Sequence, residues 1–71
     1  MDDDAGPVPV RTGVCVVRAE EWEGAVRVRI TVTGRLDIHD LATEETWCST
    51  SIPAAVAHVW EFLNAFEGAA R

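Results

Sequence analysis

The chain has 71 residues and a mass of 7.8 kDa, which is enough for one small domain and leaves no room for an active site between two domains. Hydrophobic residues make up 48% and charged residues 25% of the chain, so it fits a globular protein and fits disorder, collagen-like repetition or a disulfide scaffold poorly. The formal net charge of −6 opposes binding of the whole chain to nucleic acid or anionic membranes, because both are bound mainly through positive charge.

The first ten residues contain three aspartates and two prolines, and they lack the basic-then-apolar order of a signal peptide. No apolar run approaches the ~20 residues needed to cross a bilayer. We therefore expect a cytoplasmic protein with no membrane partner. Because the cytoplasm is reducing, Cys15 and Cys48 are expected to be free thiols rather than a disulfide.

Residues 1–12 are predicted to form an extended acidic N-terminal arm, since their prolines prevent a helix, and residues 13–71 a single small domain. Residues 14–19 are rich in β-branched side chains, which predicts a short strand. The polar link at residues 20–24 contains Gly24. It predicts a hairpin with a longer loop that pairs this strand antiparallel with the next.

Polar and apolar residues alternate over residues 26–38, which predicts a long strand with one buried and one polar face, because successive side chains of a strand point to opposite sides. Gly34 interrupts the apolar series and predicts a bulge, a bend or a close approach by another backbone. The apolar series consists of Val26, Val28, Ile30, Val32, Leu36 and Ile38.

A turn begins at Asp40, and the polar segment 43–50 predicts a third, shorter strand at an edge of the sheet. Only one of Trp47 and Cys48 can face the interior, because neighbouring side chains in a strand point to opposite faces.

The last predicted element is a helix from about Ser51 or Pro53 to Glu67, with Ser51 as its N-cap and Gly68 just after its end. Trp60 and Phe62 flank the face expected to dock on the sheet and widen the apolar stripe to roughly 160°, beyond the usual ~100°. The docking face is predicted to comprise Ile52, Ala55, Val56, Val59, Leu63 and Phe66.

These elements predict an α+β fold, a three-stranded antiparallel sheet (β-β-β-α) with one C-terminal helix packed on one face. A domain of this size is marginally stable alone, so association that covers apolar side chains would stabilise it. We therefore expect a small non-enzymatic accessory or regulatory module that acts through protein–protein association as a homodimer. Its predicted partner-binding residues are Trp22, Trp60 and Phe62.

Trp22 has two interpretations, because an indole is unusual in an acidic hairpin link. It either folds back over the edge of the core or is an exposed anchor for a protein partner.

The alternative function is nucleic-acid binding through an arginine-rich sheet face. The acidic total favours instead a solvated face whose arginines pair with carboxylates. A third hypothesis is a ligand-binding or enzymatic subunit whose pocket forms only on oligomerisation. The residues of the alternative nucleic-acid face are Arg18, Arg27, Arg29 and Arg35.

No catalytic, cofactor or metal site is predicted. The two cysteines and two histidines show none of the local spacings of zinc ligands. The acidic cluster between Asp37 and Glu45 lacks the pattern of a calcium loop, and phosphate-binding loops and nucleophile elbows are absent. The potential zinc ligands are Cys15, His39, Cys48 and His58.

Overall fold

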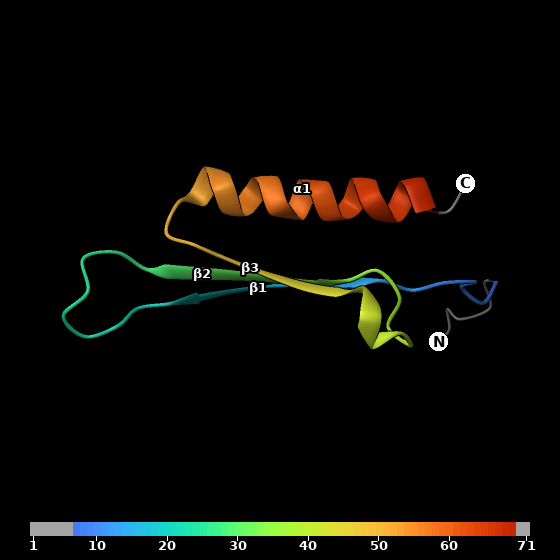
Figure 1. Ribbon diagram of the computed structural model, residues 1–71, viewed down its shortest axis with the longest axis horizontal. Coiled ribbons are helices and arrows are strands. Elements are labelled where there is room, and N and C mark those ends of the chain that lie inside the picture. Colours follow the sequence, from blue (N-terminus) through green and yellow to red (C-terminus); the bar gives the residue numbers. More distant parts are fainter. Residues whose placement is uncertain (1–6, 70–71) are drawn as a thin grey trace.

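The computed structural model describes residues 7–69, which form a three-stranded antiparallel sheet followed by one helix along one face of the sheet (Figure 1). This is the predicted α+β fold. The strand order β1-β2-β3 places β2 in the centre and leaves β1 and β3 as the edge strands. The elements are β1 (Val14–Glu20), β2 (Arg29–Arg35), the 3-10 helix η2 (Leu41–Thr43), β3 (Glu44–Ser49) and α1 (Ile52–Ala69).

The hairpin between β1 and β2 has a longer loop than predicted. Its residues 21–28 lie outside both strands, and Gly24 has a φ of +84°, a left-handed conformation that glycine adopts without strain. Because the loop takes up these residues, β2 begins later than the alternation predicted. Val26 and Val28 are exposed, so the prediction that they are buried is wrong.

The central part of the alternation is confirmed. Ile30 and Val32 are buried on the side of the sheet that carries the helix, and Val32 is the most deeply buried residue, 1% exposed. Thr31 and Thr33 point to the other side of the sheet, as the two-residue period of a strand requires.

The predicted continuation of this strand beyond Arg35 is wrong, because the chain bends at residues 36–37 and turns back through η2. Asp40 caps η2, since its Oδ1 accepts a hydrogen bond of 3.1 Å from the Ala42 backbone N–H. The Thr43 Oγ1 atom accepts another, of 3.2 Å, from the Asp37 backbone N–H. These bonds fix the turn that leads into β3.

The edge position predicted for the third strand is confirmed for β3. Trp47 pairs with Val32 and contacts the core on the helix side, whereas Cys48 pairs with Thr31 on the other face. Trp47 is therefore the inward-facing member of the pair.

The predicted N-cap of the helix is also confirmed: the Ser51 Oγ accepts a hydrogen bond of 3.3 Å from the Ala54 backbone N–H. The predicted C-terminal end is wrong, because α1 continues through Gly68 to Ala69. Gly68 does not adopt the left-handed φ of a helix-ending glycine.

The rotation of α1 about its own axis differs from the predicted one. Ala55 and Phe62 are its buried residues, and Ile52, Val56 and Leu63, which were predicted to dock, are exposed. Two glycines explain this rotation: Gly34 in β2 and Gly13, which directly precedes β1. A Cβ atom on Gly34 would be 2.5 Å from the Phe62 ring, and one on Gly13 would be 2.8 Å from the Phe66 ring.

The missing Cβ atoms thus leave hollows that the two phenyl rings fill, and the helix turns to place them there. Gly34 does mark a close approach, as one of the predicted alternatives stated, but a side chain rather than a backbone makes it.

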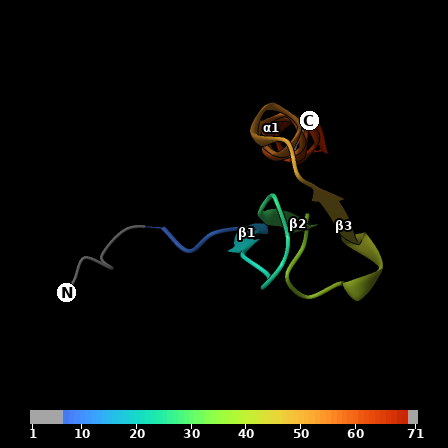
Figure 2. The same ribbon diagram turned by 90° about the vertical axis from the view of Figure 1, so that its left-hand side faces the viewer.

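The helix lies above the central strand β2, with β1 on one side and β3 on the other (Figure 2), and it contacts β2 and β3 more than β1. Ala55 packs in the core with Ile30 and Val32, and the Trp47 ring stacks on His58 with centroids 4.9 Å apart. The face of the sheet opposite α1 carries no covering element within the described residues.

Candidate protein-interaction surface

The outer edge strand β1 is exposed on both of its faces. Val17 pairs with Val32 and therefore lies on the helix side, and Val16 pairs with Thr33 and lies on the open side. Their exposed fractions are almost equal, 55% and 54%, because α1 packs mainly on β2 and β3 and Cys15 is the β1 residue that packs against the core. No strand within residues 7–69 pairs with the outer backbone edge of β1.

One flank of α1 is also apolar and exposed. The spacing of its four large apolar residues places them on one side of the helix. His58 lies on the opposite flank, where it contacts Trp47 of β3, so the apolar flank faces the side of β1. We call the exposed residues of the two elements together the β1–α1 surface. It consists of Val14, Val16 and Val17 of β1 and Ile52, Val56, Trp60 and Leu63 of α1.

The edge of β1 lacks the devices by which proteins keep exposed strands from pairing, such as lysines, prolines and bulges. Its pairing with β2 is continuous over all seven residues, and its segment Val14–Val17 carries no charge. The charged residues Arg18 and Glu20 lie at one end and face each other, with Arg18 Nε 3.7 Å from Glu20 Oε2. By contrast, β3 begins with Glu44 and Glu45.

The three predicted partner-binding residues lie in different environments. Trp60 is part of the β1–α1 surface and is 67% exposed. Phe62 is 7% exposed and packs on Gly34, so its interpretation as a partner-binding residue is corrected: it belongs to the core.

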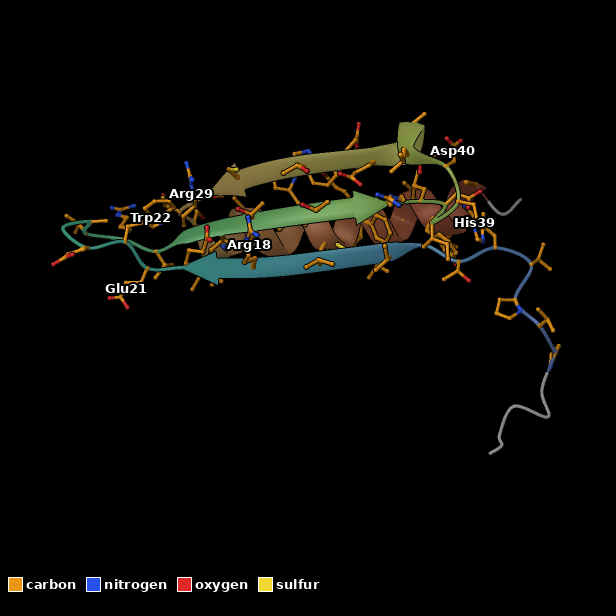
Figure 3. All side chains as sticks on the ribbon, turned by 90° about the horizontal axis from the view of Figure 1, so that it is seen from below. Arg18, Glu21, Trp22, Arg29, His39 and Asp40 are labelled. Atoms are coloured by element: carbon orange, nitrogen blue, oxygen red, sulfur yellow. The ribbon has the colours of Figure 1, made fainter. Side chains whose placement is uncertain are left out.

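Trp22 is half exposed in the hairpin loop, at the end of the sheet where Figure 3 also shows Arg29. The Arg29 guanidinium lies 5.4 Å from the centre of the Trp22 ring, within the range of a cation–π interaction. Trp22 therefore contacts an arginine and is absent from the hydrophobic core cluster.

The four arginines of the alternative nucleic-acid face do not form one stripe. Arg27 lies in the hairpin loop, and Arg29 and Arg35 lie at opposite ends of β2, with two threonines between them on the same face. Arg35 is held by Glu44, since its Nη2 lies 2.5 Å and its Nε 3.1 Å from Glu44 Oε1. Arg18 is near Glu20, as described above. Two of the four cations are thus beside carboxylates.

The two cysteines are free and lie on opposite faces of the sheet. Burial raises the pKa of the Cys15 thiol, which faces the helix side, and Cys48 is exposed on the other face. Within the described residues no three side chains of the types that bind metals come together.

A shallow pocket of about 180 Å³ lies between the C-terminal half of α1 and β3. Glu45 and Glu61 are the ionisable side chains that line it, together with the aromatic rings of Trp47 and Phe62. Thr43 also lines the pocket, and its hydroxyl donates a hydrogen bond of 2.7 Å to the Asp40 carbonyl oxygen.

Sequence reasoning missed the role of Arg11. Its Nη2 donates a hydrogen bond of 2.6 Å to the Phe66 carbonyl oxygen in the last turns of α1, and its guanidinium lies 3.8 Å from the centre of the Phe66 ring. The next residue, Thr12, accepts a backbone hydrogen bond of 3.0 Å from Ile38. The predicted arm is therefore attached to the domain at Arg11 and Thr12, and its residues 1–6 lie outside the described part of the chain.

Only a general signal pointed to Arg11: a cation is favourable near the negative C-terminal end of a helix, but nothing in the sequence indicated which helix it would reach.

Comparisons with protein families, with curated proteins and with solved structures gave no match to this chain. None of the described helices has the length and apolar character needed to span a membrane.

Proposed function

We propose that this protein is a small non-enzymatic accessory or regulatory module that acts through protein–protein association, as a homodimer. The observation that carries the proposal is the β1–α1 surface, which combines an unpaired strand edge with the exposed apolar flank of a helix. Exposed apolar surface of this extent is typical of an interaction site, and Trp60 is of the residue type that most often dominates binding energy.

The small size of the core supports the same proposal. Of the described residues, only four apolar ones are buried, namely Ile30, Val32, Ala55 and Phe62. Each Å² of apolar surface removed from water stabilises by ~25 cal/mol, so covering the β1–α1 surface adds burial that the isolated domain lacks. Association and stability are therefore expected to be coupled, with a melting temperature that rises with protein concentration.

The test is sedimentation equilibrium of the full chain across the micromolar range, with Leu63→Glu as the disrupting variant. Leu41→Glu is the matched control, because Leu41 is also an exposed leucine but lies in η2, outside the β1–α1 surface. We expect a dimer for the wild type and the control, and at least tenfold weaker association, or ~1.4 kcal/mol, for Leu63→Glu. A wild-type protein that stays monomeric throughout, or a dimer unaffected by Leu63→Glu, would refute the proposal.

A further inference from the structure

We propose that the partner is a second copy of this chain, bound by antiparallel pairing of β1 with β1 about a two-fold axis at Val17, so that two three-stranded sheets become one of six strands. This inference rests on the proposed function and specifies its geometry. The starting observation is that the outer edge of β1 offers a row of backbone groups with no described partner, which is the template that strand addition requires.

The register follows from the length and the alternation of β1. Val17 is the middle residue of Val14–Glu20, so a dyad there pairs the strand over its whole length. On the helix side this register places Val17 of one copy opposite Val17 of the other, and Cys15 of each copy opposite Ala19 of the other. These side chains are all small and apolar. A shift of one residue would place helix-side residues opposite open-side residues, so the two helices would lie on opposite faces of the joined sheet.

The charges near the two ends of β1 are complementary in this arrangement. Arg11 precedes the N-terminal end, whereas Glu21 and Glu23 follow the C-terminal end. Antiparallel pairing brings the N-terminal end of one copy to the C-terminal end of the other, so the positive charge of Arg11, held at Phe66, lies on the side of the partner's acidic hairpin. The two Arg18 side chains become diagonal neighbours, and each keeps its own Glu20 beside it.

The helix flanks join the same interface because α1 runs alongside β1. The start of α1 lies near the C-terminal end of β1, because Ala55 packs on Ile30 and Ile30 pairs with Ala19. The later part of α1 lies near the N-terminal end of β1, because Phe62 packs on Gly34 and Gly34 pairs with Cys15. After pairing, the two apolar flanks therefore face each other across the two central strands. The seven side chains of the β1–α1 surface expose on the order of 700 Å² per copy, which is the upper limit of the apolar area that pairing can cover and lies below the ~800 Å² that each partner contributes to a standard interface.

A charge swap at Val17 tests this dyad directly. Because the side chain is half exposed, Val17→Lys and Val17→Glu are expected to fold, which circular dichroism verifies. Each variant alone places like charges opposite each other and is expected to be monomeric, whereas an equimolar mixture is expected to form a heterodimer. The same two substitutions at Leu41 are the control: each variant alone should stay dimeric, and in the mixture the subunits should exchange without preference for the heterodimer.

Disulfide trapping tests the register independently of stability. Residues directly opposite each other in antiparallel strands lie within the Cα distance that a disulfide spans, and diagonal neighbours lie at about 7–8 Å, beyond it. With Cys15 and Cys48 replaced by serine, Val17→Cys should form a covalent dimer under oxidised glutathione, and Val16→Cys should not. With only Cys48 replaced, Ala19→Cys should be trapped through the native Cys15.

The outcomes separate this inference from the proposed function. Heterodimer formation in the mixture together with trapping of Val17→Cys supports the β1–β1 pairing. A wild-type dimer that depends on Leu63 but whose Val17 variants remain dimeric and are not trapped overturns the pairing and leaves the proposed function intact. A wild-type monomer overturns both.

Discussion

The phenyl ring of Phe62 occupies the space that a side chain at Gly34 would need, with the ring Cδ1 2.5 Å from the position of a Cβ atom. This contact sets the rotation of α1 on the sheet. It buries Phe62 and consequently turns Ile52, Val56 and Leu63 outward, toward the side of β1.

Gly34→Ala should therefore destabilise the protein by about 1–3 kcal/mol, the usual cost of overpacking, because the added methyl group displaces the Phe62 ring. Urea denaturation measures the change. Gly68→Ala is the control: a Cβ atom there meets nothing within 4 Å, and alanine in a helix is favoured over glycine by ~0.5–1 kcal/mol. Equal stability of Gly34→Ala and the wild type would contradict this account of the helix rotation.

Removal of the Arg11 side chain should loosen the C-terminal turns of α1. Arg11→Ala loses both the hydrogen bond to the Phe66 carbonyl and the cation–π contact, for a cost of about 1 kcal/mol. Amide hydrogen exchange should speed up in the last turns of α1 and stay unchanged in its first turn. Arg27→Ala, which removes an arginine of the hairpin loop, is the control. If Arg27→Ala also accelerated exchange in the last turns of α1, the effect could not be assigned to the Arg11–Phe66 contact.

The two thiols should differ in reactivity. Cys48 is exposed, whereas burial raises the pKa of Cys15, so a smaller fraction of Cys15 is the reactive thiolate at any pH below that pKa. At pH 8, iodoacetamide should modify Cys48 first, as mass spectrometry of peptides detects. Urea should abolish the difference, since the pKa shift comes from folding. Faster modification of Cys15 in the folded protein would show that the raised pKa is not what governs its reactivity.

The Arg35–Glu44 pair should contribute little to stability. Both side chains are partly exposed to solvent, and pairs of this kind are typically worth ~0.2–1 kcal/mol. A double-mutant cycle with Arg35→Ala and Glu44→Ala gives the coupling energy, and we expect it to fall as salt is added. A coupling well above this range, or one independent of salt, would indicate a stronger role in holding β2 to β3.

The sequence was sufficient to predict the fold class because its strongest patterns are local. Alternation at Ile30 to Thr33 and the serine before α1 each depend on near neighbours along the chain. The start of β2 was harder to predict, because the alternation of polar and apolar residues extends back into the hairpin loop, which turns at Gly24.

The rotation of α1 was not predictable, because the apolar stripe is so wide that several rotations bury a similar set of side chains. The choice between Phe62 and Leu63 depends on the hollow at Gly34, which exists only once the sheet and helix are together. For the same reason the sequence could not show which of the two flanking aromatic residues is buried. Both were predicted to bind a partner, but Phe62 is buried and only Trp60 is exposed.

The off-centre position of α1 makes the two edges of the sheet, β1 and β3, unequal. At β3 the helix and the carboxylates of Glu44 and Glu45 stand beside the outermost strand, whereas β1 is bare. Addition of further chains to the sheet is therefore favoured at the β1 edge, and a single such event uses that edge up in both participants. An assembly built this way is finite, a closed pair rather than a fibre.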